Sequence, residues 1–121
     1  MCLKDQVALI TGAANGIGLA TAQRFCIEGA ACVLVDRDEE AGHAAVESIA
    51  SSGGRARFVA ADVSCAASCE AMVAEAEAEF GKLTVLFNNA GIMDGNDGDA
   101  EATTEEVWDR TMSINLKGVW L

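Results

Sequence analysis

The chain has 121 residues, of which 51% are hydrophobic and 22% are charged, and this composition predicts a single globular domain over residues 1–121. Its 19 acidic and 8 basic residues leave a net charge of −11, which argues against nucleic acid or an anionic membrane as a partner because both are bound through Lys and Arg. No apolar run approaches the roughly 20 residues of a membrane helix, and the first residues lack a signal-peptide core, so we expect a cytoplasmic protein.

Segments typical of strands and of helices alternate along the chain. Four short apolar runs predict strands, at residues 6–10, 31–36, 56–62 and 83–88. Helical patterns follow them, at 17–28, at 38–51, after an N-cap at Ser64 up to Phe80, and after a capping box of Thr103 and Glu106. Strands that are apolar on both faces need helices on both sides. The pattern therefore predicts an α/β fold, the first half of a Rossmann-type doubly wound parallel sheet with about four βα units.

The stretch TGAANGIG, residues 11–18, places three glycines between the first strand and the first helix. Gly12 suits a tight turn off the strand, because glycine adopts a positive φ without strain. Gly16 leaves room for a pyrophosphate, and Gly18 lets the helix lie close to the sheet. The helix N-terminus offers free N–H groups and the positive end of its dipole to phosphate. This turn, with Asn15 and Ile17, predicts a dinucleotide site, and a tight turn without a ligand is the alternative.

An acidic residue ends the second predicted strand. Asp36 lies where a dinucleotide fold carries the residue that accepts hydrogen bonds from the adenosine ribose. A carboxylate at this position repels a 2′-phosphate, so NAD is expected in preference to NADP. Arg37 weakens this preference, because its guanidinium could reach a phosphate, whereas Asn15 adds no positive charge to the turn. The alternative is that Asp36 is an ordinary acid at the start of a helix.

The glycine spacing of TGAANGIG resembles that of short-chain dehydrogenases/reductases, and three further stretches match the same family in the same order. They are ADV at 61–63, NNAG at 88–91 and INLKG at 114–118. The resemblance covers essentially the whole chain, in register with the predicted strands. It implies that Asp62 and Val63 border the adenine and that Asn88 steadies the sheet. It also implies that the backbone of the NNAG stretch, through Ala90 and Gly91, lines the cofactor cleft.

Members of this family transfer hydride between an alcohol or ketone and NAD(P), with a Tyr as the general acid–base group, assisted by a Lys and a Ser. Asn115 is similar to the family's catalytic asparagine, which holds a water in the proton relay. This chain contains no Tyr, so the resemblance implies the N-terminal, NAD-binding portion of such an enzyme, truncated before the Ser, Tyr and Lys. Without a tuned proton donor, we expect the chain alone to be inactive.

Two other functions stay open from the sequence. The predicted open edge of the fourth strand and the apolar last helix favour an interaction fragment that pairs with a full-length relative. The resemblance implies that the same region packs against a second subunit in a homo-oligomer. The third hypothesis is a nucleotide-binding Rossmann protein of another kind, such as a methyltransferase.

No metal site is predicted. The five cysteines are irregularly spaced, and Cys65 and Cys69 have no second pair of Cys or His residues to complete a zinc site. We expect free thiols, with a reactive role for some of them as the alternative. The acidic stretch 94–106 fails as a calcium loop, because Gly98 stands where a ligand is needed and Asp99 where glycine is needed.

Overall fold

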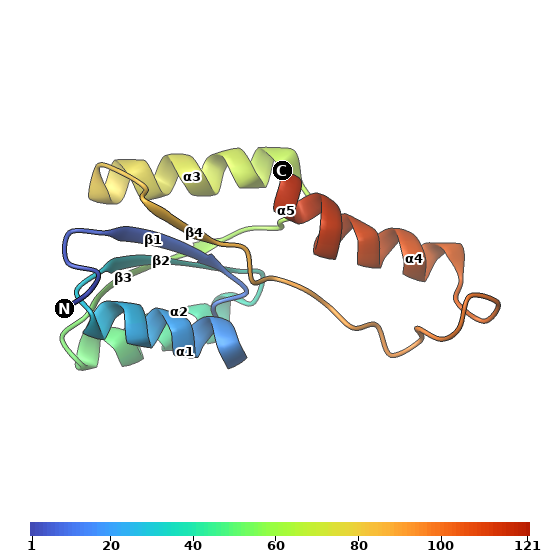
Figure 1. Cartoon of the computed structure of the whole chain (residues 1–121), viewed down its shortest axis with the longest axis horizontal. Helices are drawn as coiled ribbons and strands as arrows, with labels where there is room; N and C mark the ends of the chain where they lie inside the picture. The colour runs from blue at the N-terminus through green and yellow to red at the C-terminus, as the bar shows by residue number, and fades with distance from the viewer.

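The computed structural model describes residues 1–121 and contains the predicted alternation of strands and helices. Its elements are β1 (Val7–Thr11), α1 (Gly16–Ile27), β2 (Ala31–Asp36), α2 (Glu39–Ser51), β3 (Arg55–Ala60), α3 (Ala66–Phe80), β4 (Val85–Phe87), α4 (Glu105–Met112), a π-helical segment (Ser113–Lys117) and α5 (Gly118–Trp120). Figure 1 shows the sheet between two helical layers, with α1 and α2 on one face and α3 on the other.

The four strands form one parallel sheet in the order β3-β2-β1-β4. The chain runs outward from β1 to β2 and β3, and then returns past β1 to β4. Doubly wound folds bind ligands at the carboxyl ends of the strands where the order reverses in this way, which here is between β1 and β4. The predicted fold class is confirmed. The strand order indicates a ligand site at the carboxyl ends of β1 and β4.

The core consists of two apolar layers, one on each face of the sheet. On β2, Cys32 and Leu34 pack with residues of α1 and α2, whereas Val33 and Val35 pack with residues of α3. All four side chains are at most 1% exposed. Burial on both faces explains why β2 is a continuous apolar run and not an alternating one.

The sequence predicted the wrong N-cap residue for α3. Ser64 does not cap the helix, because the N-cap residue is Cys65 and its side chain makes no capping hydrogen bond. The hydroxyl of Ser64 instead donates to Oδ1 of Asp62 at 2.6 Å. A hydroxyl next to a carboxylate thus forms a local turn bond in place of the expected helix cap.

The predicted capping box of α4 was also wrong. The N-cap is Thr104, whose Oγ1 accepts a hydrogen bond from the Val107 N–H at 3.2 Å. Thr103 lies one residue earlier, and its hydroxyl donates to Asp97 at 3.1 Å within the preceding loop. Either of the two adjacent threonines could cap the helix by its side chain. The bond of Thr103 to Asp97 in the loop leaves Thr104 as the cap.

The last part of the chain extends away from the layers. A long loop leads from β4 to α4, which continues through the π-helical segment into α5 near the first residues of α3 (Figure 1). Large apolar side chains of this region are exposed, among them Leu116 at 62% and Trp120 at 79%. None of the helices combines the length and the apolar character that crossing a membrane requires.

The glycine turn and α1 approach too closely for a side chain at Gly18. A Cβ built there would clash with the carbonyl oxygen of Gly12, a backbone atom that cannot rotate away. We expect Gly18→Ala to lower the free energy of unfolding by about 1–3 kcal/mol, which is the usual cost of overpacking. Urea denaturation followed by circular dichroism measures this change.

Gly95→Ala is the matched control for that measurement, because a Cβ at this exposed loop position would meet no atom within 4 Å. Its free energy of unfolding should stay within about 0.5 kcal/mol of the parent value. Equal losses for the two variants would contradict the close approach at Gly18.

Candidate functional site

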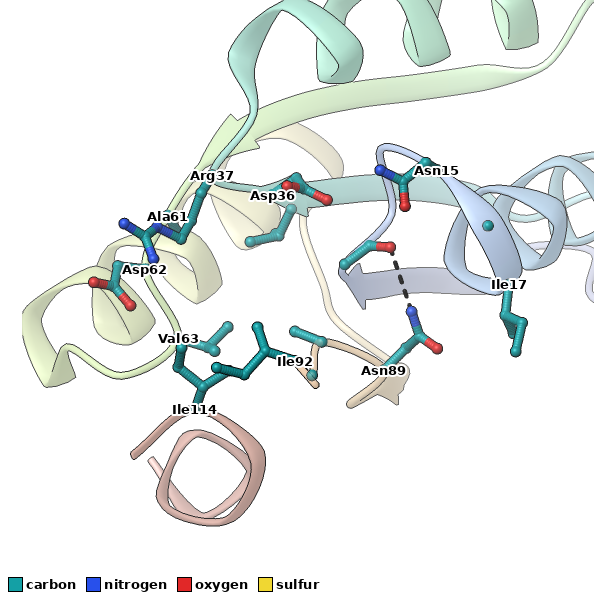
Figure 2. Close-up of a pocket in the computed structure, with 15 residues that line it drawn as sticks. Asn15, Ile17, Asp36, Arg37, Ala61, Asp62, Val63, Asn89, Ile92 and Ile114 are labelled. Atoms are coloured by element: carbon teal, nitrogen blue, oxygen red, sulfur yellow. Dashed lines mark hydrogen bonds between the residues drawn. The ribbon is translucent and has the colours of Figure 1, made fainter. Parts of the chain in front are cut away.

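A cavity of about 390 Å³ opens at the carboxyl ends of β1, β2 and β4. Its walls come from the glycine turn, the end of β2, the segment after β3, the loop after β4 and the π-helical segment. Figure 2 shows Asn15 and Asp36 on one side of this space, with Val63 and Ile114 on the other. We call this cavity the crevice.

The glycine turn has the backbone conformation that the sequence predicts. Gly12 and Gly16 have φ values of +65° and +57°, in the left-handed region that other residues avoid. A Cβ at Gly16 would meet no atom within 4 Å, so the turn is open toward the crevice at this position. Gly18 is buried, and the nearest neighbour of its missing side chain is the Gly12 carbonyl. The missing Cβ at Gly18 therefore lets α1 approach the carboxyl end of β1 closely, at the Gly12 carbonyl.

The first turn of α1 presents unpaired backbone donors. The earliest backbone hydrogen bond of the helix runs from the Leu19 N–H to the Asn15 carbonyl at 3.2 Å. The N–H groups of Gly16, Ile17 and Gly18 come before it and have no acceptor within the helix. Together with the helix dipole they form a donor set suited to an anion. The Asn15 side chain makes no capping bond and lines the crevice.

The carboxylate of Asp36 links the tip of β2 to the glycine turn. Its Oδ2 accepts from the Ala14 N–H and its Oδ1 from the Asp38 N–H, both at 3.1 Å. A carboxylate has about four acceptor positions, so both oxygens retain capacity for a ligand hydroxyl. The side chain is partly buried at the rim of the crevice. The local bonds therefore fix the orientation of this acceptor before any ligand arrives.

Asp62 lies in the wall that follows β3. Its Oδ1 accepts from the N–H and the hydroxyl of Ser64, at 3.0 and 2.6 Å. These two bonds lower the pKa of Asp62, with a smaller contribution from the positive charge of Arg37, against a partial opposing effect of burial. The resulting stabilisation is complete above the pKa of an unfolded Asp and is lost as the pH falls through the lowered native pKa. Arg37 extends from the tip of β2 toward Asp62 (Figure 2).

Thr11 and Asn89, which the sequence analysis missed, hold the ends of β1 and β4 together. Thr11 is 2% exposed, and its Oγ1 accepts from the N–H groups of Asn89 and Ala90 at 3.0 and 2.9 Å. The Nδ2 of Asn89 donates to the carbonyl oxygens of Thr11 and Gly12 at 3.1 and 3.3 Å, the latter bond being dashed in Figure 2. Asn89 thus holds the ends of two strands together, whereas the resemblance implied that Asn88 steadies the sheet. Asn88 itself is exposed and does not line the crevice.

The side chain of Asn115 holds the loop after β4. Its Oδ1 accepts from the Ile92 N–H at 2.8 Å, and its Nδ2 donates to the Ile92 carbonyl at 2.9 Å. Gly91 packs against it, since a Cβ there would lie 3.4 Å from the same Oδ1. Asn115 lies in the π-helical segment, a geometry often found at functional sites. Its contacts make it a positioning residue, and the catalytic role stays a prediction.

The crevice brings together most of the residues that the sequence singled out. Those that line it are Gly12, Asn15, Gly16, Ile17, Asp36, Arg37, Asp62, Val63, Ala90 and Gly91. Gly18, Asn88 and Asn115 do not line it. The wall also includes residues that were not predicted, namely Val35, Ala61, Asn89, Ile92 and Ile114. Four of these five are apolar, and of these only Ala61 lies in a stretch that the sequence singled out, ADV at 61–63.

Comparison with known proteins places this geometry in a family. The family model of short chain dehydrogenases matches residues 6–121. This chain belongs to the short-chain dehydrogenase family. It is 43% identical over 115 residues to the short-chain reductase protein NovJ of Streptomyces niveus, which covers 95% of this chain and 43% of that relative. Galactitol 2-dehydrogenase of Agrobacterium fabrum is 43% identical over 118 residues, which covers 98% of this chain and 44% of that relative.

Solved structures give the same family. The 3-ketoacyl-(acyl-carrier-protein) reductase from Brucella melitensis, complexed with NADH, superposes with a TM-score of 0.91 at 41% identity, over 98% of this chain and 48% of that one. A mutant short-chain dehydrogenase/reductase of Serratia marcescens has a TM-score of 0.93 at 30% identity, over 99% and 49% of the two chains. The predicted family is thereby confirmed. The short-chain dehydrogenase chain described here spans about half the length of the curated relatives it matches.

The two neighbouring asparagines give a matched test of the corrected bridging role. Asn89→Ala removes the side-chain donor to the carbonyl oxygens of Thr11 and Gly12, so we expect the free energy of unfolding to fall by about 1–3 kcal/mol. Asn88→Ala changes an exposed residue, and its effect should stay within about 0.5 kcal/mol. Urea denaturation of both variants checks this, and a larger loss for Asn88→Ala would reverse the assignment.

Proposed function

We propose that this chain is the NAD(H)-binding portion of an oxidoreductase that interconverts an alcohol and a ketone. The observation that carries the proposal is the hydrogen bond from the Ala14 N–H to the Asp36 carboxylate, at 3.1 Å. It joins the acid at the tip of β2 to the glycine turn in one rigid unit. That unit offers amide donors next to a carboxylate, which are the partners that the diphosphate and the ribose of a dinucleotide require.

The other residues of the crevice fit the remaining parts of such a cofactor. The open Cβ direction at Gly16 leaves space for a diphosphate close to the helix N-terminus. Asp62 and Val63 would border the adenine, and Ala90 and Gly91 would line the path toward the nicotinamide. The structural relative complexed with NADH supports a nicotinamide dinucleotide as the ligand.

NAD is the proposed cofactor in preference to NADP. A 2′-phosphate on the adenosine ribose would meet the Asp36 carboxylate, and the two negative charges repel each other. Arg37 is the cation that could compensate, but it extends toward Asp62, whose negative charge attracts it (Figure 2). The arrangement therefore favours a free 2′-hydroxyl at this position.

When bound, the nicotinamide supplies the hydride acceptor or donor of the reaction. The residues of this chain bind and orient the cofactor, and the Asn115–Ile92 pair fixes the loop that faces it. The chain has no Tyr to give or take the proton of the alcohol, so we propose that it binds the cofactor without turnover by itself. Binding and conversion of an alcohol or ketone are proposed for the whole protein.

Several predictions from composition are not tested by the fold. The single-domain boundary at 1–121, the cytoplasmic location and the lack of nucleic-acid and membrane partners stay predictions, which rest on the net charge of −11 and on the hydropathy pattern.

Calorimetric titration with NAD and with NADP tests the proposed function. Asp36→Ala removes an acceptor for charge-assisted hydrogen bonds, so we expect the affinity for NAD to fall roughly tenfold to a hundredfold. The affinity for NADP should fall less or rise, because the like charge beside the 2′-phosphate is gone. The ratio of the two affinities is the informative quantity, since any general effect of the substitution on folding cancels in it.

Asp38→Ser is the matched control for this titration. It removes a neighbouring negative charge but keeps a side-chain oxygen that can accept from the Ala41 N–H at the start of α2, as Asp38 does at 3.1 Å. The ratio of NAD to NADP affinity should therefore stay close to that of the parent. Equal losses for both cofactors in Asp36→Ala would show that the carboxylate does not contact the ribose, and no binding of either by the parent would refute the proposal.

A second candidate function is an interaction fragment that pairs with a full-length relative. Exposed apolar side chains favour it, on the edge strand β4 (Leu86, 50% exposed) and around α5 (Leu116, Val119 and Trp120). Single exposed apolar residues are common on protein surfaces, but several of them together often mark a protein–protein contact. A homo-oligomer formed through the last helix would use the same residues.

Size-exclusion chromatography of this chain mixed with a full-length short-chain dehydrogenase tests the second candidate. Co-elution is expected if the fragment pairs, and Trp120→Glu should abolish it by placing a charge in the contact. Met93→Glu is the control, because Met93 is 92% exposed but lies in the loop after β4. Separate elution of the parent chain would remove this candidate.

A further inference from the structure

Arg37 is the only cationic residue in the wall of the crevice. It follows Asp36 at the tip of β2, and the other two charged residues of the wall are the carboxylates of Asp36 and Asp62. The Arg37 side chain takes no part in the ion pairs of the structure, which are made by Arg24, Arg57 and Arg110. The surrounding charges therefore decide in which direction this guanidinium extends.

The pairing of two strands brings Arg37 close to the segment that carries Asp62. β2 and β3 run parallel, and their last paired residues are Asp36 and Ala60. The Ala61 N–H then donates to the Asp36 carbonyl at 3.2 Å, so the two segments leave the sheet side by side. Figure 2 shows the side chain of Arg37 extending toward Asp62, whereas Asp36 lies on the side of Asn15.

One oxygen of the Asp62 carboxylate has no hydrogen-bond partner. Oδ1 accepts from the N–H and the hydroxyl of Ser64, at 3.0 and 2.6 Å, and these bonds fix the orientation of the carboxylate. The Ser64 bonds are the main cause that lowers the pKa of Asp62, and the positive charge of Arg37 contributes in the same direction. Asp62 is thus an oriented anion whose Oδ2 remains available to a cation.

The acidic neighbours of Arg37 in the chain are already bound to backbone donors. Asp36 accepts through both oxygens, from the N–H groups of Ala14 and Asp38. Asp38 caps α2 by accepting from the Ala41 N–H, and it does not line the crevice. Within the crevice wall, Asp62 is therefore the acid that has a carboxylate oxygen without a bond.

A 2′-phosphate on the cofactor would need the same guanidinium. Under the proposed function the adenosine ribose lies at Asp36, so a phosphate on its 2′-oxygen adds a negative charge beside a carboxylate. A guanidinium can compensate this charge, because it binds phosphate through two parallel N–H donors. Arg37 is the only such group in the wall, so Asp62 and a 2′-phosphate compete for it.

We propose that Asp62 is a positioning residue for Arg37, which keeps the guanidinium away from the ribose site and thereby maintains the preference for NAD over NADP. The inference rests on the proposed function, since it concerns the same cofactor. It adds a second determinant to the first. Asp36 repels the 2′-phosphate, and Asp62 withholds the cation that would attract it.

Calorimetric titration of Asp62→Asn with NAD and with NADP, at low ionic strength, tests this proposal. Asparagine has the shape of aspartate and keeps an oxygen for the Ser64 bonds, but it carries no charge. We expect the ratio of NADP to NAD affinity to rise roughly twofold to fivefold, which corresponds to an exposed ion pair. Any loss of contacts to the adenine affects both cofactors equally and cancels in the ratio.

The same substitution in an Arg37→Gln background separates positioning from direct repulsion. With no guanidinium to release, Asp62→Asn should change the ratio much less than it does in the parent chain. If Asp62 instead repelled the 2′-phosphate directly, its removal would raise the ratio equally in both backgrounds. That result would overturn the proposal.

Glu77→Gln is the matched control for the lost charge. Glu77 is exposed on α3, makes no ion pair and does not line the crevice, so the ratio should stay at the parent value. Circular dichroism shows that each variant is folded before it is titrated. If Asp62→Asn does not fold, Asp62→Ser removes the same charge and takes its place in both backgrounds.

The outcomes distinguish this inference from the function on which it rests. A parent chain that prefers NAD, with an unchanged ratio in the Asp62 variant, would refute the role of Asp62 and leave the proposed function in place. A parent chain that binds neither cofactor would refute both. A ratio that rises only when Arg37 is present would support the positioning role.

Discussion

The hydrogen bonds between Thr11 and Asn89 are the contact on which the crevice depends. β4 pairs with β1 over only three residues, the last pair being Ile10 and Phe87. Just beyond this pair, the Thr11 hydroxyl and the Asn89 amide join the two segments with four bonds of 2.9 to 3.3 Å. They fix the glycine turn on one side and the loop through Ala90 on the other, so that both walls have a defined separation. A buried threonine is tolerated there because its oxygen is fully used.

The sequence predicted the parts of the site that follow from local chemistry. The positive φ of Gly12 and the open space at Gly16 follow from the absence of a Cβ, and free N–H groups follow from the start of a helix. The position of Asp36 follows from the end of an apolar run. Each inference needed only a few neighbouring residues, and the parallel sheet then brought these pieces together at one edge. The family resemblance added Asp62 and Val63, which local patterns do not mark.

Two of the errors concern choices between adjacent residues of the same type. Asn88 and Asn89 carry the same amide, and only the phase of β4 decides which of them turns toward the Gly12 carbonyl. Thr103 and Thr104 differ in the same way at the start of α4. The π-helical segment around Asn115 has no local signature, because its side chain pairs with Ile92 across the loop. These features depend on contacts between segments, which composition and periodicity do not encode.

α1 and β2 contact each other at both ends of the sheet, the carboxyl end with the crevice and the opposite amino end. At the carboxyl end, Asp36 of β2 accepts from Ala14, just before α1 begins. At the amino end, Cys26 of α1 packs against the apolar layer that includes Cys32 of β2. The 12 residues of α1 span about 18 Å as a stiff rod, so its two contacts with β2 restrain one orientation. Between the two ends, Ala22 of α1 and Leu34 of β2 belong to the same buried layer, so close packing holds the tilt of α1 against the sheet along its length.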